Sequence, residues 1–258
     1  MAIDYIPSQP FFELSTKEFK STFRTQSGHL TQYYSFSLPQ KAAKPIVAVP
    51  DGTVDIIFHC SPSKPKAYIC GSVKKGKEIC FKNGIEYFGV RFLPGGAEEL
   101  LDCPLSHFTD QEVLLEDVHK KTSSLIDSIN MAKSFEERIN LFESYNTVHQ
   151  SPQKQMWLVN YMLERINNTR GEIRIQELAD DTGFSARHIN NVFKTHVGIA
   201  PKLFIRIVRF QKCFSLIRNQ LSFDYTEMAQ EAGYYDQAHF IKEFKEFSLC
   251  TPTQIGIC

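Results

Sequence analysis

The last third of the sequence contains nearly the same unit twice, and this repeat constrains the fold more than any other feature. Residues 183–194 read GFSARHINNVFK, and residues 233–245 read GYYDQAHFIKEFK. In each copy a glycine precedes a preferred N-cap residue, Ser185 or Asp236, and a helical pattern follows. Glycine supplies the positive φ that a sharp turn between helices usually needs. The repeat therefore predicts two similar units, each with two helices joined by a tight turn.

The correspondence extends to both sides of this turn, with one extra residue in the second copy, Tyr235 or its neighbour. The small residues Ala179 and Ala229 allow the two helices of each unit to approach closely. The other aligned pairs are Leu178 with Met228, His188 with His239, Phe193-Lys194 with Phe244-Lys245, and Pro201 with Pro252.

The second helix of each unit has an apolar face and a polar face. The apolar residues, three or four apart, are Ile189, Val192 and Phe193 in the first copy and Phe240, Phe244 and Phe247 in the second. The opposite faces carry Arg187, Asn190, Asn191 and Lys194, and Gln237, Ile241, Lys242 and Lys245. Asn and Gln can pair with adenine, Arg and Lys with guanine, and Ile can contact a thymine methyl group. Although most surface helices have a polar face, two of this composition in tandem favour the recognition of two adjacent major-groove half-sites in double-stranded DNA.

The first part of the chain has a different pattern, in which short apolar runs alternate with turn residues. The predicted strands are residues 30–38, 45–49, 53–60, 66–70, 77–81 and 86–92. Strands spaced this closely favour a small sandwich or barrel. From Glu98 onward no strand is predicted, so the expected class is α+β. We expect a β-barrel domain with trailing helices over residues 1–150 and an all-α domain over residues 151–258, with the boundary near Ser151-Pro152.

Residues 134–150 are predicted to form a helix at the end of the first domain. Ser134 is a good N-cap, and Glu137 completes a capping box. The apolar stripe consists of Phe135, Ile139, Phe142 and Tyr145. This stripe either packs on the barrel or forms a dimer interface.

On these residues the C-terminal part resembles the DNA-binding domain of AraC/XylS-type transcription regulators. The resemblance runs through residues 173–217 and 225–255. It implies two helix-turn-helix units joined by a central helix over residues 201–219, and a bacterial transcription regulator without enzymatic activity, whose partners are DNA and RNA polymerase. It also implies base contacts by Arg187, Asn190, Asn191, Gln237 and Lys242. His188 and His239 either pack between the helices or contact phosphate.

Two departures from the family pattern affect this expectation. Leu249 stands where relatives have glycine, and loss of that left-handed cap would cost about 1 kcal/mol or shift the helix end. From Lys154 onward the sequence has 13 Lys or Arg and 11 Asp or Glu, a net charge of 13 − 11 = +2. Affinity should then depend on a few well-placed cations. The candidates on the central helix are Lys202, Arg206, Arg209, Lys212 and Arg218.

The N-terminal half resembles the barrel domain that precedes such modules in one group of these regulators. The similar segments are VPDGTVDIIF (residues 49–58) and FGVRFLPGG (residues 88–96). The resemblance implies a cupin-like barrel that binds a small effector and forms a homodimer. The candidate lining residues are Tyr33, Phe36, Ile57, Phe58, Phe88 and Phe92, although aromatic residues in strands are more often plain core. His29, His59 and His107 form no His-x-His pair, so we expect no metal and no cofactor.

A second class of function involves the cysteines. Some DNA-repair methyl-acceptor proteins carry a similar helical module behind a zinc-bound cysteine, and Cys60, Cys70, Cys80 and Cys103 could be read in that way. Their wide spacing lacks the close pairs of a zinc knuckle and favours buried thiols, with a redox sensor as another reading. A third reading is a ligand-binding barrel whose helical domain does not bind DNA.

Composition and the N-terminal sequence indicate the expected cellular compartment. No run approaches the roughly 18 to 20 apolar residues that a membrane span needs, and the N-terminus has no basic region typical of a signal peptide. Seven cysteines, an odd number without a pairing pattern, indicate reduced thiols. We therefore expect a cytoplasmic protein.

Overall fold

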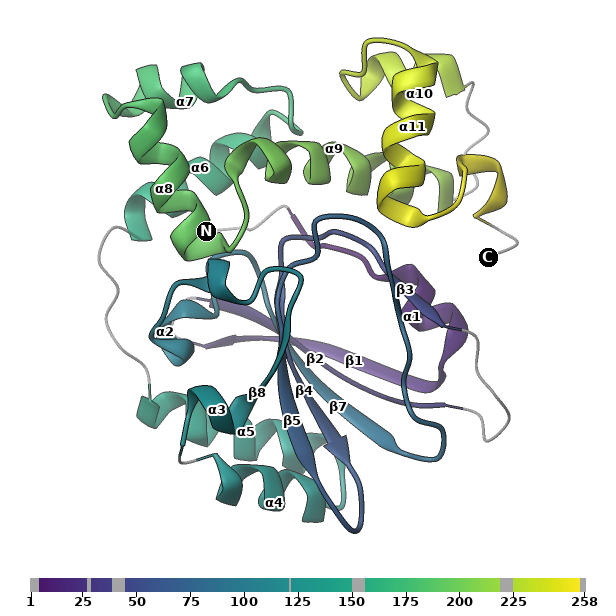
Figure 1. The fold of residues 1–258 in the computed structure, drawn as a ribbon, viewed down its shortest axis with the longest axis vertical. Coiled ribbons are helices and arrows are strands. Elements are labelled where there is room, and N and C mark those ends of the chain that lie inside the picture. The colour runs from purple at the N-terminus through teal and green to yellow at the C-terminus, as the bar shows by residue number, and fades with distance from the viewer. Residues whose placement is uncertain are drawn as a thin grey trace.

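The computed structural model describes residues 5–26, 29–38, 45–120, 122–149, 156–218 and 225–255. Figure 1 shows a sheet-containing part built from the N-terminal half and, above it, a group of helices built from the C-terminal half. The predicted division into a β-rich N-terminal part and a helical C-terminal part is therefore confirmed. The predicted boundary at Ser151-Pro152 lies outside the described residues, and the division at residue 150 remains a prediction.

The N-terminal part is organised around an antiparallel six-stranded sheet. Its strands, in spatial order, are β1 (Lys17–Gln26), β2 (His29–Ser37), β7 (Glu86–Phe92), β4 (Val54–Cys60), β5 (Lys66–Cys70) and β8 (Glu112–Leu114). Two further strands, β3 (Ile46–Ala48) and β6 (Lys77–Ile79), pair with each other.

The barrel is not closed, which corrects the expectation from the sequence. β1 and β8 form the two edges of the six-stranded sheet, and no pairing joins these edges among the described strands. The sequence analysis also placed no strand before residue 30 or after Glu98, so β1 and β8 were both missed. The six predicted strands are all present, and β5 and β7 have the predicted bounds.

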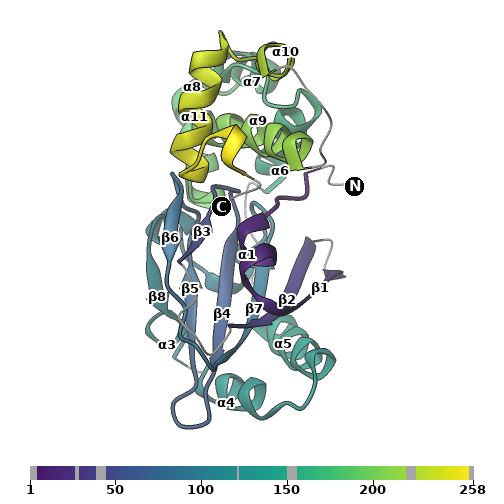
Figure 2. The ribbon, with the colours of Figure 1, turned by 90° about the vertical axis from the view of Figure 1, so that its right-hand side faces the viewer.

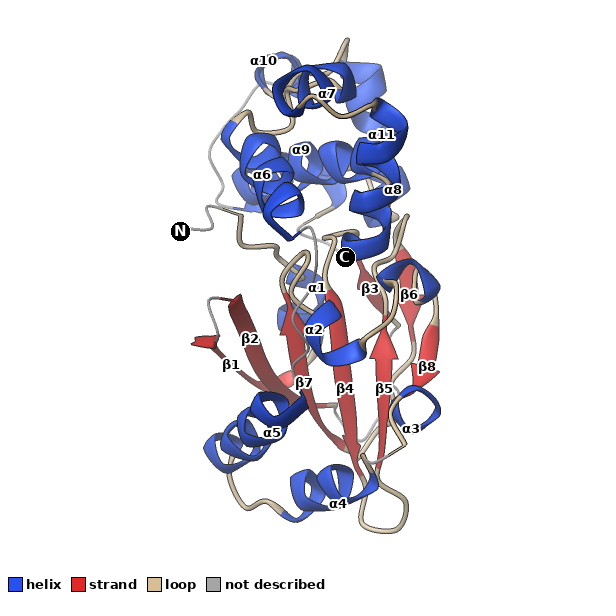
Figure 3. Cartoon of the chain, turned by 90° about the vertical axis from the view of Figure 1, so that its left-hand side faces the viewer, coloured by secondary structure: helices blue, strands red, loops and turns tan. Residues whose placement is uncertain are grey.

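One face of the sheet is covered by helices that follow it in sequence. These are α2 (Glu98–Leu101), the 3-10 turn η1 (Leu105–His107), α3 (Leu115–Val118), α4 (Ser123–Met131) and α5 (Phe135–His149). Figure 3 shows α4 and α5 at the end of the sheet away from the C-terminal helices.

The apolar stripe of α5 packs on the sheet of its own chain. Ile139 and Phe142 are fully buried, and the ring of Phe142 lies 6.2 Å from the rings of Tyr33, Phe58 and Phe92. Because these side chains already belong to the core, the stripe is not a dimer interface, and that alternative is wrong.

The N-cap of α5 differs slightly from the predicted capping box. The Ser134 hydroxyl accepts a hydrogen bond from the Glu137 N–H (3.1 Å), as expected. The Glu137 carboxylate instead accepts from the N–H of Lys133 (2.8 Å), one residue earlier.

The C-terminal part consists of helices arranged around one long member. The helices are α6 (Met156–Asn168), α7 (Ile175–Thr182), α8 (Ala186–Val197), α9 (Pro201–Arg218), α10 (Tyr225–Glu231) and α11 (Gln237–Ser248), followed by η2 (Pro252–Gln254). Figure 1 shows α9 running between the α7–α8 unit and the α10–α11 unit. The predicted central helix over residues 201–219 is thus confirmed.

The two parts share one hydrophobic core. The N-terminal segment and α1 (Pro10–Ser15) lie between the second face of the sheet and α9. Tyr5 contacts Phe204 and Phe11 contacts Phe214, with ring centroids 5.6 and 5.8 Å apart. The position of α9 therefore depends on residues from the start of the chain.

Candidate nucleic-acid interface

The first unit, α7 and α8, has the capped turn that the repeat predicts. α7 ends at Gly183, which has a φ of 72° and donates its N–H to the carbonyl oxygen of Ala179 (2.9 Å). The Ser185 hydroxyl accepts a hydrogen bond from the His188 N–H (3.2 Å) and begins α8. Full burial of Ile189 fixes the apolar side of this helix against the core.

The second unit, α10 and α11, repeats this construction. Gly233 also has a φ of 72°, and the next residue, Tyr234, donates its N–H to the Ala229 carbonyl oxygen (2.8 Å). The Asp236 carboxylate accepts a hydrogen bond from the His239 N–H (2.7 Å) and begins α11. Both predicted N-caps are therefore confirmed, and α8 and α11 are called the recognition helices below.

The second recognition helix ends without the usual glycine. Gly198 ends α8 with a φ of 93°, and Leu249 ends α11 with a φ of 60°. In both copies the cap N–H donates to the carbonyl oxygen of a lysine four residues earlier, Lys194 or Lys245. The helix end is not shifted, so Leu249 keeps a left-handed conformation that costs roughly 1–2 kcal/mol for a residue with a side chain.

The outward faces of the recognition helices are exposed except at Ile241, which packs against the core. Arg187, Asn190, Asn191 and Lys194 of α8 are exposed, as are Gln237, Lys242 and Lys245 of α11, whereas Ile241 is half-buried. Figure 2 shows α8 and α11 on the same side of the molecule. The structure thus places the two helices that carry the candidate base-contacting side chains on one side of the molecule.

The cations of α9 have largely internal partners. Arg206 forms ion pairs with Glu243 (2.6 Å) and Glu246 (3.0 Å) of α11. Arg209 donates to the Gly233 carbonyl oxygen (3.1 Å), and its guanidinium lies over the Tyr234 ring. Among the candidate cations of α9, Arg206 therefore holds α11, and Arg209 holds the turn that precedes α11.

The remaining central cations are more accessible. Lys202 is exposed and lines a groove of about 860 Å³ between the two units. The ammonium of Lys212 donates to the Glu231 carbonyl oxygen (3.2 Å) at the surface. The side chain of Arg218 lies outside the described part of the structure.

The two aligned histidines pack against aromatic rings at the turn. The His188 ring stacks on Phe184, with centroids 4.7 Å apart, and the His239 ring meets Tyr234 edge-on at 5.4 Å. These contacts favour packing between the helices for His188, which is half-buried, and leave the exposed His239 accessible.

The predicted ligand-lining residues belong almost entirely to the hydrophobic cores. Tyr33, Phe58, Phe88 and Phe92 pack under α5, and Phe36 packs on the opposite side of the sheet. These five side chains are at most 2% exposed. Ile57 differs, because it lines a cavity of about 190 Å³ at the end of the sheet that faces α9. The aromatic residues are therefore plain core, and the cavity has a different and more polar lining.

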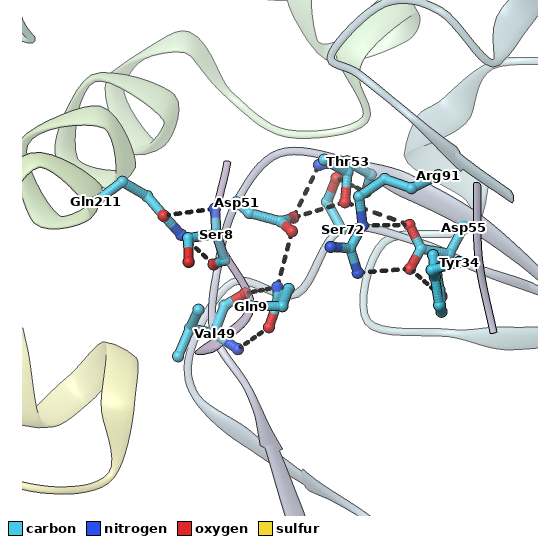
Figure 4. Close-up of polar contacts among 10 residues, drawn as sticks. All are labelled: Ser8, Gln9, Tyr34, Val49, Asp51, Thr53, Asp55, Ser72, Arg91 and Gln211. Carbon is cyan, nitrogen blue, oxygen red and sulfur yellow. Dashed lines mark hydrogen bonds and ion pairs between the residues drawn. The ribbon is translucent and has the colours of Figure 1, made fainter. Parts of the chain in front are cut away.

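That lining is part of a buried polar network that the sequence analysis did not identify. Arg91 donates to both carboxylate oxygens of Asp55 (2.9 and 2.7 Å), and the Tyr34 hydroxyl also donates to Asp55 (2.7 Å). Gln9 donates to the Asp51 carboxylate (2.7 Å). Figure 4 shows these side chains converging from the N-terminal segment and from three parts of the sheet. The acidic residues in 51–55 and the arginine within FGVRF were the available sequence signals.

The network continues to the central helix. The Gln211 side chain of α9 donates to the Pro50 carbonyl oxygen (2.9 Å) and accepts from the Ser8 N–H (3.0 Å). Gln9, adjacent to Ser8, bonds to the cavity-lining Asp51. A short chain of hydrogen bonds thus joins the cavity to α9 (Figure 4).

The charges of the network are strongly coupled. Burial lowers the pKa of Arg91, but the carboxylates of Asp55 and Asp51 outweigh that effect and raise it. Burial raises the pKa of Asp51, although Arg91 and the hydrogen bond from Gln9 oppose this rise. Arg91 is therefore the positive charge that keeps two buried acids in place.

The cysteines give no support to the zinc and methyl-acceptor reading. Burial raises the pKa of the Cys60 thiol to about 11 and that of Cys70 well above its usual value, so both are protonated at neutral pH. A protonated thiol is a poor nucleophile and a poor metal ligand. Within the described ranges, no three His, Cys, Asp or Glu side chains are grouped to hold a metal ion.

The fold and site define a protein with a sheet domain and a tandem helix-turn-helix domain. Comparison with known proteins identifies the type of the helix-turn-helix domain. Residues 178–256 match a family model described as a helix-turn-helix domain, and residues 26–114 match a domain of unknown function, DUF6597. The match confirms the resemblance to AraC/XylS-type regulators: the C-terminal part of the chain is a helix-turn-helix domain of that type.

A related protein of Haemophilus influenzae is described as an uncharacterized HTH-type transcriptional regulator. It is 29% identical over 89 residues, which are 34% of this chain and 30% of that protein. The chain thus matches less than a third of the length of this relative.

Comparison with solved structures found several similar chains. The C-terminal domain of AraT, a response regulator from Geobacillus stearothermophilus, is 20% identical and covers 40% of this chain and 85% of that chain, with a TM-score of 0.36. ToxT from Vibrio cholerae bound to unsaturated fatty acid is 11% identical and covers 90% of this chain and 96% of that chain, with a TM-score of 0.39. TM-scores below 0.5 do not define the fold.

One further observation concerns membranes. Among the helices in the described ranges, none is both long and apolar enough to cross a bilayer.

Proposed function

We propose that the protein is a sequence-specific DNA-binding transcription regulator whose recognition helices read two adjacent major-groove half-sites. The observation that carries this proposal is the pair of capped helices with exposed Arg, Asn, Gln and Lys side chains on one face. Side chains of these types can read base edges in the major groove. A surface helix without this function would not need exposed side chains of these types in both copies.

The arrangement of the apolar faces supports the same proposal. Phe193 of α8 and Phe244 of α11 are fully buried against α9. Base contacts by the opposite faces would therefore leave the core intact. Because α9 fixes both helices, their separation is set by the protein rather than by the DNA, as a pair of fixed half-sites requires.

Two single substitutions should separate the half-sites. We expect Asn191→Ala in α8 to relax base preference in one half-site only, with a loss of about 1–3 kcal/mol on the preferred sequence. Lys242→Ala in α11 should act on the other half-site if the ammonium contacts a base. If it contacts only phosphate, all sequences should weaken alike, and the slope of log K against log salt should fall by about one unit. Binding-site selection with the wild type and both variants measures these effects.

A matched control is Asn160→Ala, which removes an exposed amide on α6. Figure 2 shows α6 on the side of the molecule opposite to α8 and α11, so this variant should keep the wild-type base preference. Alteration of the same base positions by Asn191→Ala and Lys242→Ala would refute the two-half-site model. Absence of any salt-dependent DNA binding by the wild type would refute the regulator itself.

We also propose that a small polar molecule bound in the cavity at the end of the sheet controls the DNA-binding domain. The cavity of about 190 Å³ is lined by Asp51, Asp55 and Arg91, and it has room for about six water molecules. Its lining residues connect through Gln9 and the N-terminal segment to Gln211 of α9. A ligand that competes for these hydrogen bonds would act on α9 directly.

Thermal unfolding with a panel of pentoses, hexoses and linear diamines tests the cavity. A ligand should raise the thermal unfolding midpoint of the wild type and also change its affinity for DNA. In Gln211→Leu the same ligand should still raise the midpoint, but it should no longer change DNA affinity, because the connection to α9 is removed. If the ligand still changed the DNA affinity of Gln211→Leu, the connection through Gln211 would be contradicted. If no compound of the panel stabilised the wild type, the proposed ligand class would be contradicted.

A further inference from the structure

The loop between β5 and β6 is attached to the C-terminal end of the second recognition helix. Residues 73–77, which end this loop and begin β6, read VKKGK. The Gly76 N–H donates to the Glu246 carbonyl oxygen (3.0 Å). A Cβ atom at Gly76 would lie 2.8 Å from the Phe247 carbonyl oxygen and 2.9 Å from Leu249 Cγ, so glycine is required for this close approach. The three lysines of the loop are therefore held at a fixed position beside α11.

The charge of the second unit makes this position significant. Within residues 225–254 the cations are Lys242 and Lys245, and the acids are Glu227, Glu231, Asp236, Glu243 and Glu246, a net charge of 2 − 5 = −3. A surface that binds DNA must neutralise phosphates with cations. The loop adds Lys74, Lys75 and Lys77, which brings the sum to 2 + 3 − 5 = 0. The second unit thus obtains more cations from the attached loop than it has itself.

Lys74 and Lys75 are available for a new partner. Their side chains are 55% and 69% exposed, and they pair with Asp110 (2.8 Å) and Glu246 (3.2 Å). Each acid also has another partner, since Asp110 accepts the backbone N–H of Lys74 (2.9 Å) and Glu246 pairs with Arg206. Exposed pairs of this kind contribute little to stability, so both ammonium groups can exchange their carboxylates for phosphates.

The loop also lies on the appropriate side of the molecule. Figure 2 shows β6, which directly follows the loop, beneath α11 and on the side where both recognition helices lie. A DNA strand that borders the major groove occupied by α11 would pass the C-terminal end of this helix.

We propose that Lys74 and Lys75 of the N-terminal domain contact the phosphate backbone of the DNA beside the half-site that α11 reads. The inference rests on the proposed DNA-binding function and extends the DNA surface beyond the helix-turn-helix domain. The partner is double-stranded DNA, recognised at this point through its phosphates alone.

The test measures the salt dependence of DNA binding by the full chain. The double variant Lys74→Ala/Lys75→Ala should lower the slope of log K against log salt by about 0.9 for each lysine. At about 0.1 M salt this corresponds to an affinity loss of about eightfold per lysine. Base preference should not change, and Lys74→Arg/Lys75→Arg should restore both slope and affinity. The control Lys64→Ala/Lys66→Ala removes two exposed lysines near the other end of β5 and should leave the slope unchanged.

Asp110→Asn separates phosphate contact from a structural role. It removes the carboxylate partner of Lys74, while the amide oxygen can still accept the Lys74 N–H, so affinity should stay or rise. If Lys74 served only to anchor the loop on Asp110, this variant would weaken binding as Lys74→Ala does, and the proposal would be overturned. If the wild type and the double variant bound DNA with the same salt slope, the proposed phosphate contacts would also be overturned. The proposed DNA-binding function would not be affected by that result. A wild type without DNA binding would instead remove the proposed function.

Discussion

Arg91→Met should lower the free energy of unfolding by roughly 3–5 kcal/mol at neutral pH, because it leaves buried carboxylates without their counter-charge. The Arg91 side chain is 8% exposed and bonds to both oxygens of Asp55, and Asp51 lies in the same network. Methionine fills a similar volume without charge. Urea denaturation followed by circular dichroism measures the loss.

The pH dependence of this loss has a defined sign. Burial already raises the folded-state pKa of Asp51, and loss of the opposing charge of Arg91 should raise it further. A carboxyl group with a raised folded pKa destabilises the fold increasingly as pH rises from the unfolded to the folded value. The difference between wild type and Arg91→Met should therefore be largest at neutral pH and shrink below about pH 4.

Two further variants make the Arg91 prediction specific. Arg165→Met removes an arginine whose pair with Asp181 lies at the surface, so it should leave the denaturation midpoint almost unchanged. Asp55→Asn combined with Arg91→Met removes one unpaired charge and should recover part of the lost stability. Equal losses from Arg91→Met and Arg165→Met would show that the network is not a buried charge cluster.

Phe210→Ala should cost about 3–5 kcal/mol, the range for truncation of a fully buried phenylalanine. The Phe210 ring is fully buried in α9. It contacts Phe214, Phe244 and Phe247, with ring centroids 5.2 to 5.6 Å away. Two of these partners belong to α11, so the cavity would form where the second recognition helix rests on the central helix.

This substitution should also have an unequal effect on DNA binding. Selection at a temperature where the variant remains folded should show a weaker preference in the half-site read by α11 and a retained preference in the half-site read by α8. Phe23→Ala is the control, because Phe23 lies on the edge strand β1 and is 38% exposed, so its loss should be small. A uniform weakening of both half-sites would mean that α9 transmits the change to both units.

Much of the fold could be predicted because its signals are local. The N-caps Ser185 and Asp236 each bond to an N–H three residues away, and the turn glycines adopt positive φ within the same few residues. Strands β5 and β7 were found with their correct bounds because turn residues flank an apolar run. Such features depend on residues close in sequence, and the sequence alone therefore specifies them.

The two missed strands had no local signal of that strength. β1 reads KEFKSTFRTQ, a largely polar edge strand that pairs with β2 alone. β8 has three residues, Glu112–Leu114, and exists because β5 offers it a partner. These segments form strands because a neighbouring strand pairs with them, and this pairing exists only in the assembled sheet.

The ambiguity of the candidate ligand-lining residues has a related cause. Tyr33 and Tyr34 are adjacent in β2, point to opposite faces and are both buried, because helices cover one face and the N-terminal segment with α9 covers the other. Burial on both faces removes the alternation that would separate core from cavity. The polar network was equally hidden, since Gln9, Asp51, Arg91 and Gln211 lie far apart in the sequence.

Local residue patterns thus specify the class of each half, the duplicated units and the side chains on their outward faces. Long-range packing alone establishes that the sheet remains open, that α5 packs on its own chain, and that Arg206 holds α11 while Arg209 holds the turn before it. It alone brought the lysines of residues 73–77 to the acidic second unit. The physical reason is the range of the interactions: caps, turns and helical faces form between residues a few positions apart, whereas sheet closure, ion pairing and domain contact join residues separated by much of the chain.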